Sequence, residues 1–239
     1  MVLGSRQQIE SITRQGLNIS IRGEVVQRVS ESRNLGLLMD EELLFEKHIT
    51  NTASNCFYRL KVMYQIREYL STPIRIKLCD SLVLSKFNYM DAVYGPRLLA
   101  RSQKLVQRVQ NACARFCFKI PPRTHVTPYI NKARILKMKY RRQYHFATLM
   151  FGVVKFKLPP YLADKLVWSR DVTAARTRAS YYSLAIPRHR TTAFRGSFSF
   201  AASKCWNDLP PPFRSLIGFN TVARRSPPSG LDAATQPLS

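Results

Sequence analysis

Acidic residues are scarce in this sequence. Its 239 residues include 38 Lys and Arg but only 14 Asp and Glu, which gives a formal net charge of +24. Between Asp91 and Asp164 there is no acid, whereas the same stretch holds 15 basic residues with interleaved aromatic residues. Such a balance predicts a polyanionic partner, either a nucleic acid or an anionic membrane surface. Cations interleaved with flat rings suit a groove that binds nucleic acid.

Long apolar runs are also missing. The longest, residues 146–154, is far shorter than the ~20 residues that a transmembrane helix needs. The first ten residues lack the apolar segment of a secretory signal peptide. The five cysteines are odd in number and irregularly spaced, so we interpret them as reduced and mostly buried. We therefore expect an intracellular protein, cytoplasmic and/or nuclear, without a membrane partner; a basic peripheral protein of anionic membranes is the outside alternative.

Catalytic and metal-binding motifs are missing too. Asp91 is followed by Ala92, whereas two-metal phosphoryl transfer needs clustered carboxylates. Cys113 and Cys117, with His125, could form half of a zinc site, but both cysteines share an apolar helix face, so core packing is the better interpretation. There is no glycine-rich phosphate-binding loop. We therefore predict no catalytic residue, no metal site and no cofactor.

The stretch from Arg97 to Lys119 predicts a strongly amphipathic helix, ended by Pro121-Pro122. At 100° per residue its apolar side chains fall in one arc of about 140°. This apolar arc consists of Leu98, Leu105, Val106, Val109, Ala112, Cys113, Phe116 and Cys117. A second arc, about 80° wide, is polar and basic, and we call it the basic arc. It consists of Arg101, Lys104, Arg108, Asn111, Arg115 and Lys119.

We expect this helix to bury its apolar arc and to present its basic arc to the phosphates of a nucleic acid. Arg141 and Arg142, in the same acid-free stretch, complete the predicted binding residues. A solvated surface face is the alternative interpretation, because runs of charge often have no partner.

Hydrophobic periodicity predicts an α+β fold. Residues 1–39 should form a small β-sheet fragment, with strands at 1–3, 17–21 and 24–29 and a turn at Arg22-Gly23. Asp40 should cap a helix over 41–70, and Thr72-Pro73 should start another that ends near residue 88. A further helix is predicted over 137–155. A mixed region of short strands and loops should follow over 168–215, and a disordered tail from 217.

Several motifs also occur in the order found in one family. The N-terminal ones are Met1-Val2-Leu3-Gly4-Ser5, Asn34-Leu35-Gly36 with Asp40, and Leu43, Phe45, His48 and Ile49. The central ones are Ser81-Leu82-Val83-Leu84-Ser85, Tyr89, Tyr94-Gly95, and Val109-Gln110-Asn111-Ala112 with Arg115. The most specific are Pro159-Pro160-Tyr161-Leu162 and Trp206-Asn207-Asp208-Leu209-Pro210. From about Met1 to Ser215 the chain resembles the C-terminal part of the reverse transcriptase of jockey/CR1-like non-LTR retrotransposons.

The resemblance implies four regions: the end of the palm (1–39), a basic helical thumb (40–162), a mixed C-terminal region (163–216) and a tail (217–239). It implies RNA, or an RNA–DNA template–primer duplex, as the partner. The endonuclease, fingers and catalytic palm of such a protein would lie upstream of Met1. The Tyr-x-Asp-Asp motif is absent, since Tyr89-Met90-Asp91-Ala92 has one acid, so the family's RNA-directed DNA polymerase activity is not carried over.

We therefore expect a non-catalytic C-terminal fragment of such a reverse transcriptase that keeps a basic RNA-binding or template–primer-binding surface. The alternative is a degenerate retroelement-derived protein with no selected function. The segment after about residue 217 departs from the family pattern, which indicates a frame change or a decayed copy. The sequence leaves the oligomeric state open.

Overall fold

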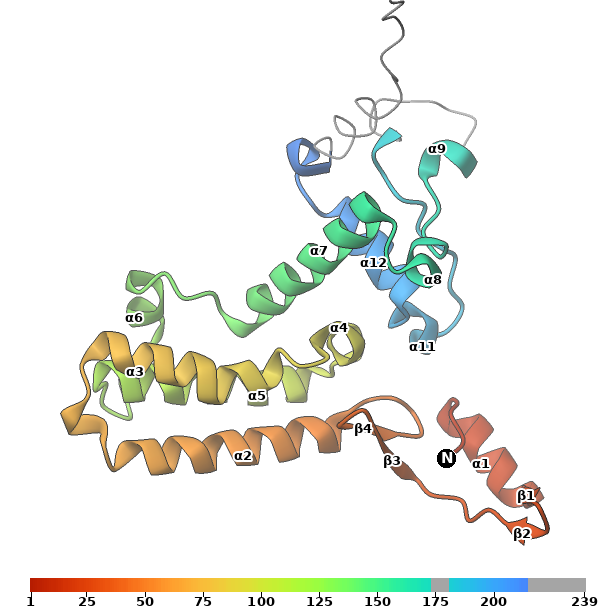
Figure 1. Cartoon of the computed structure of the whole chain (residues 1–239), viewed down its shortest axis with the longest axis horizontal. Coiled ribbons are helices and arrows are strands. Elements are labelled where there is room, and N and C mark those ends of the chain that lie inside the picture. Colours follow the sequence, from red (N-terminus) through yellow and green to blue (C-terminus); the bar gives the residue numbers. More distant parts are fainter. Residues whose placement is uncertain (173–180, 215–239) are drawn as a thin grey trace, which may run out of the picture. The chain divides into compact units, whose positions relative to one another are not determined.

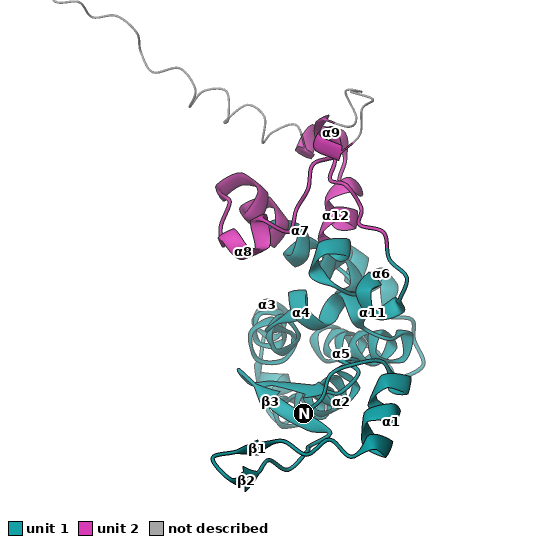
Figure 2. Cartoon of the chain, turned by 90° about the vertical axis from the view of Figure 1, so that its right-hand side faces the viewer, with its two compact units in different colours: residues 1–148, 189–201 teal, residues 149–188, 202–239 magenta. Residues whose placement is uncertain are grey.

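The computed structural model describes residues 1–172 and 181–214. Helices dominate it, and two antiparallel sheets of two strands each lie near the N-terminus (Figure 1), which confirms the α+β fold class. The chain divides into two compact units, residues 1–148 with 189–201 and residues 149–188 with 202–239 (Figure 2). The four regions expected from the sequence stay predictions. They were drawn from the family resemblance, whereas these two units are defined by compactness.

The N-terminal segment combines one helix with two hairpins. Strands β1 (Ser20–Ile21) and β2 (Glu24–Val25) pair across the predicted turn, where Arg22 and Gly23 both have positive φ, as two-residue hairpin turns require. Strands β3 (Glu31–Asn34) and β4 (Leu37–Asp40) form the second hairpin. The strand expected at 1–3 is absent from the described residues.

A helix that the periodicity did not predict, α1 (Arg6–Gln15), follows that segment. Ser5 and Gln8 form a reciprocal capping box at its start, and Gly16 ends it in the left-handed conformation. Ile9 is the helix's buried residue. A helix with one buried side chain has little apolar periodicity. Its capping residues, Ser5, Gln8 and Gly16, are the sequence feature from which it could have been predicted.

Two long parallel helices, α2 (Glu46–Tyr64) and α5 (Ala100–Phe118), build the core of the first unit. The predicted apolar arc of α5 is buried or partly buried along its whole length, which confirms that prediction. From α2 the same core receives five residues at helical spacing: Ile49, Ala53, Cys56, Leu60 and Met63.

The helix predicted over 72–88 is interrupted. It starts as α3 (Thr72–Leu78), continues as one π-helical stretch, η2 (Cys79–Val83), and ends as a 3₁₀ turn, η3 (Leu84–Phe87). The wider π turn changes which of the following residues face inward. A regular helix would place Leu82, three residues after buried Cys79, on the inner face, but Leu82 is 42% exposed, whereas Leu84 is buried. The helix N-cap is Ser71, with Pro73 in the first turn as expected.

Asp40 acts just before α2, and not as its N-cap. Its two carboxylate oxygens accept hydrogen bonds from the backbone N–H groups of Leu44 (2.8 Å) and Phe45 (2.6 Å). Phe45 is the N-cap residue and has a positive φ. Asp40 therefore fixes the loop that joins the second hairpin to the helix.

Short helices complete the first unit. A turn of helix, α4 (Asp91–Tyr94), and a 3₁₀ turn, η4 (Gly95–Arg97), lead into α5. The helix predicted over 137–155 is confirmed as α7 (Met138–Phe156), a long helix whose residues up to 148 belong to the first unit and whose later residues belong to the second. Before it lies α6 (Thr127–Lys132), which was not predicted. Its Ile130 forms a second apolar cluster with Ala114, Ile120 and Val126.

The C-terminal region is more helical than the sequence indicated. It contains α8 (Pro160–Ala163), α9 (Ser169–Val172), α11 (Thr192–Arg195) and α12 (Phe198–Asn207). Of the short strands expected there, the described residues show one bridge, between Trp168 and Leu184. The indole N–H of buried Trp206 donates to the carbonyl of Tyr182 (2.9 Å). The side chain of Asn207 pairs with both backbone groups of Leu184 (2.9 and 2.8 Å). The predicted tail lies outside the described residues.

Among residues 1–172 and 181–214, no helix is both long enough and apolar enough to cross a membrane.

We expect the first hairpin to be the least protected part of the first unit. All four residues of its strands are exposed, as are Leu17, Ile19 and Val26 beside them. A two-stranded sheet without a covered face is marginal in water. Hydrogen exchange should show far lower protection for the hydrogen-bonded amides of residues 20–26 than for residues 105–117 of α5. Equal protection would mean that another surface covers the hairpin.

Stability should fall below about pH 6.5 through His48. Burial, with a smaller contribution from the Arg33 charge, lowers the pKa of His48 from its ordinary value of 6.5. Its Nδ1 lies 3.4 Å from the backbone N–H of Leu38, which the neutral ring can accept. Because the unfolded chain takes up the proton first, the free energy of unfolding should drop as pH falls from about 6.5 toward the lowered pKa. A His48→Gln variant should lose that part of the pH dependence in chemical denaturation; identical pH profiles would contradict the assignment.

Candidate nucleic-acid interface

The basic arc of α5 lies opposite its buried arc, so the helix is oriented as the sequence predicted. Arg101, Lys104, Arg108 and Lys119 are exposed, whereas Asn111 and Arg115 are half-buried. The eight predicted binding residues therefore differ in how far they can reach a ligand. None of these positions by itself demonstrates binding.

Acidic residues from outside α5 neutralise both ends of its basic arc. Arg101 forms an ion pair with Glu46 at the start of α2, and Lys119 forms one with Glu68, just beyond the end of α2. These two pairs join matching ends of the two parallel helices. Both are largely exposed, so salt screens them and they contribute little to stability.

Lys104 and Arg108 are the unpaired cations of the basic arc. They make no hydrogen bond or ion pair with any residue that the structure describes. They are four positions apart, one helical turn, and lie between the two ion-paired ends. Their charges are therefore available to an external anion without first breaking a contact within the chain.

Gln110, Asn111 and Arg115, which belong to a family-like motif, hold neighbouring segments in place. The side chain of Gln110, only 2% exposed, donates to the carbonyl of Leu136 (2.8 Å) and accepts from the N–H of Met138 (3.1 Å). It thereby positions the start of α7. Arg115 reaches the carbonyls of Pro122 (3.2 Å) and Thr124 (3.4 Å), and Asn111 accepts from Gln107 (2.9 Å). These interactions give the motif a structural role.

Arg141 and Arg142 are half-buried contacts of α7. Arg141 pairs with Asp80 and donates to the side chain of Asn88 (3.2 Å), so it ties α7 to the interrupted helix. Burial lowers the pKa of the Arg142 guanidinium, and its Nη1 is enclosed without a hydrogen-bond partner among the described residues. Their role in binding nucleic acid stays a prediction, and Arg142 lacks the exposure of the α5 cations.

The single acid of the Tyr89–Ala92 motif is also engaged. The Asp91 carboxylate is buried and lies 2.8 Å from Nδ1 of His145 on α7. Cys113 and Cys117 lie in the core, as predicted, with the Cys117 sulfur 3.6 Å from that of Cys79. All five cysteines are free and four of them are buried. Within the described part of the chain, no group of three His, Cys, Asp or Glu side chains could hold a metal ion.

Arg67 is a contributor that sequence reasoning missed. Its guanidinium donates to the carbonyls of Phe116 (2.9 Å) and Arg115 (3.0 Å), which are among the last carbonyls of α5. A cation at this end also complements the helix dipole. The signal is not visible in the sequence, because 48 and 49 residues separate the partners.

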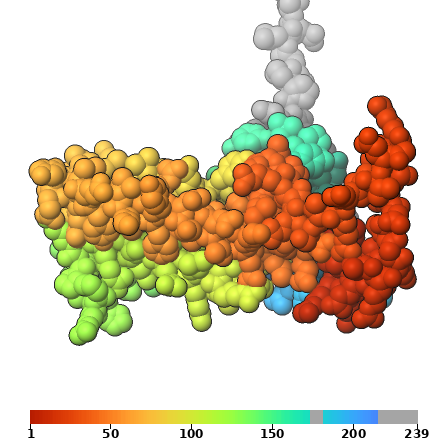
Figure 3. All heavy atoms as spheres, turned by 90° about the horizontal axis from the view of Figure 1, so that it is seen from below, coloured from red at the N-terminus to blue at the C-terminus, as the bar shows by residue number. Residues whose placement is uncertain are grey.

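The outward face of α2 adds exposed residues beside α5. Tyr58 is 70% exposed, Tyr64 is 42% exposed, and Lys61 is exposed and has no partner among the described residues. Figure 3 shows α2 (orange) with the yellow segment 72–90 along one edge and the green α5 along the other. A helical-wheel analysis of α2 would have placed Tyr58 opposite the buried face and Lys61 and Tyr64 on the flank of that face.

Comparison of the chain with protein-family models, with curated proteins and with solved structures finds no match.

Proposed function

We propose that this chain is a non-catalytic, reverse-transcriptase-like segment that binds RNA or an RNA–DNA duplex through the exposed faces of α2 and α5. The observation that carries the proposal is the pair Lys104 and Arg108. They are exposed and unpaired on a helix whose orientation the buried core fixes. The family-like motifs in the sequence support the same class of partner.

The charge distribution supports a polyanion over a small anion. Lys61 on α2 and Lys104 and Arg108 on α5 belong to two parallel helices that pack together. Phosphates repeat along a strand, so cations spread over several turns suit a backbone. Exposed Tyr58 offers a face for base stacking, which does not depend on sequence. Contacts with phosphates carry no base information, so little sequence preference is expected.

Replacing Lys104 and Arg108 by Gln should flatten the salt dependence of RNA binding. Each lost phosphate contact removes about 0.9 units from the slope of log K against log salt on duplex and about 0.7 on a single strand, so the pair should remove roughly 1.4 to 1.8 units. Gln keeps the helix propensity, so the fold should survive. Fluorescence anisotropy over a salt series, with circular dichroism as the folding check, measures both.

The matched control is Arg14→Gln with Arg195→Gln, which removes two exposed charges outside α2 and α5. Its slope should stay at the wild-type value. An unchanged slope in the folded Lys104/Arg108 variant would show that the α5 face is only solvated. Binding to phosphatidylserine vesicles that exceeds RNA binding at matched salt would favour the peripheral-membrane alternative instead.

A further inference from the structure

A groove of about 410 Å³ lies along the flank of α2 that faces the interrupted helix. Its lining consists of Thr52, Asn55, Arg59, Ser85, Lys86 and Tyr89. All six are polar, and none is acidic. The volume is within the range of small-ligand sites, which run from about 300 to 1,000 Å³.

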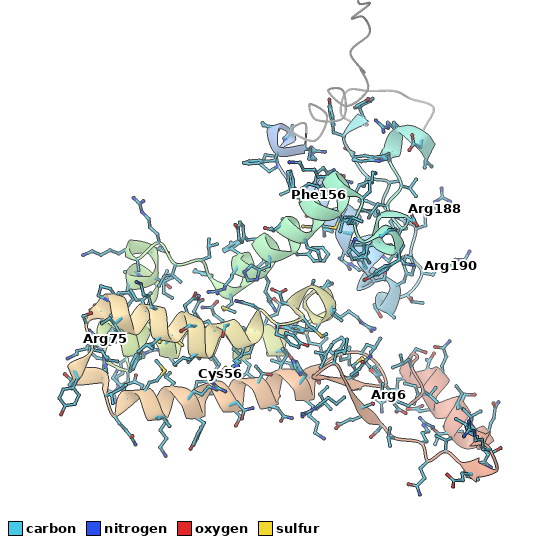
Figure 4. All side chains as sticks on the ribbon, viewed as in Figure 1. Arg6, Cys56, Arg75, Phe156, Arg188 and Arg190 are labelled. Carbon is cyan, nitrogen blue, oxygen red and sulfur yellow. The ribbon has the colours of Figure 1, made fainter. Side chains whose placement is uncertain are left out.

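Specific contacts hold the two walls of the groove. Cys56, whose side chain is labelled in Figure 4, donates from its thiol to the carbonyl of Val83 (3.3 Å) and so links α2 to η2. Tyr89 donates from its hydroxyl to the carbonyl of Leu35 (2.5 Å), at the turn of the second hairpin. Ser85 donates to the carbonyl of Ser81 (2.5 Å). The groove is therefore anchored to three elements of the first unit.

The irregular backbone of η2 and η3 forms the second wall. A π turn followed directly by a 3₁₀ turn rotates the residues that follow relative to a regular helix. Ser85, Lys86 and Tyr89 consequently line the groove together with α2. Isolated π turns in helices occur frequently at functional sites, because they redirect side chains at the expense of regular hydrogen bonding.

Two cations in the groove have no counter-charge. Arg59 and Lys86 are exposed and form no ion pair or hydrogen bond within residues 1–172 and 181–214. Both act on the same thiol: burial raises the pKa of Cys56 to about 11, and the charges of Arg59 and Lys86 oppose that rise. Arg59 on α2 and Lys86 on η3 line the groove from its two walls, where a bound anion would relieve their mutual repulsion.

The remaining donors suit a tetrahedral anion. The hydroxyl of Thr52 and the amide of Asn55 have no partner among the described residues, so both can donate. The hydroxyls of Ser85 and Tyr89 already donate to carbonyls, so these two residues serve as walls. Guanidinium groups bind phosphate oxygens in a bidentate manner, and an ammonium adds a point charge.

We propose that this groove binds one phosphodiester of a nucleic-acid strand, with Arg59 and Lys86 on its non-bridging oxygens and Thr52 and Asn55 as further donors. The ring of Tyr89, 53% exposed at the rim, stacks on an adjacent base. This inference rests on the proposed function and extends it, because α2 then separates two phosphate-binding rows: the groove on one flank and Lys104 with Arg108 on the other.

The direct test is a nuclear magnetic resonance titration with the dinucleotide UpU, which carries one phosphodiester. Saturable shifts are expected for the amides of residues 52–59 and 85–89 and for the Arg59 side chain. The Arg59→Gln/Lys86→Gln variant should lose them while its spectrum stays folded. The Arg14→Gln/Arg195→Gln control should keep them. Inorganic phosphate that shifts the same signals at equal or lower concentration would overturn the phosphodiester assignment.

Binding of a longer RNA separates this inference from the proposed function. The Arg59→Gln/Lys86→Gln variant should flatten the salt slope by about 0.7 to 0.9 units, because the groove holds one phosphate. A wild-type slope in that variant, together with a flattened slope in the Lys104/Arg108 variant, would overturn the groove and leave the proposed function standing. A wild-type chain that binds no RNA but does bind UpU in the groove would contradict the proposed function and would reassign the groove to free dinucleotides.

Discussion

The parallel packing of α2 against α5 is the contact on which the first unit depends. Ile49, Ala53 and Leu60 of α2 share one core with Val109 and Phe116 of α5. Full burial of a large apolar side chain contributes about 1.5–3 kcal/mol, whereas an exposed ion pair contributes little. The apolar faces therefore decide which sides of both helices meet water. The two ion pairs with Glu46 and Glu68 then join the ends of the packed helices.

The few acids of the chain serve as connections between elements. Eight of the 14 Asp and Glu residues form ion pairs among the described residues, several between segments far apart in the sequence: Glu41 with Arg28, Glu46 with Arg101, Glu68 with Lys119, and Asp80 with Arg141. The surplus cations remain at the surface. A net charge of this size destabilises the compact state, because the surface cations repel one another. A bound polyanion would reduce that repulsion and so stabilise the fold.

The sequence was sufficient for α5, α2 and α7, because a sustained helical period marks a buried face wherever the chain is regular. The basic arc was also placed correctly. The ion pairs of Arg101 and Lys119 were not predicted. Their partners Glu46 and Glu68 lie outside α5, so the pattern within that helix does not reveal them. The same holds for Arg67 at the end of α5. Periodicity cannot anticipate a π turn, so the exchange of Leu82 for Leu84 was missed. The groove was missed with it, because Arg59 and Lys86 come together only once that turn is formed.

The central claim is that nucleic acid lies on α2 and its two flanks. Photo-cross-linking with a 5-iodouridine-substituted RNA, followed by mass spectrometry of the tryptic peptides, tests this most directly, because the label reacts with stacked aromatic rings. The account predicts cross-links at Tyr58 on the outward face of α2 and at Tyr89 on the groove. Cross-links confined to the equally exposed Tyr140 and Tyr144 of α7, with none at Tyr58 or Tyr89, would contradict it.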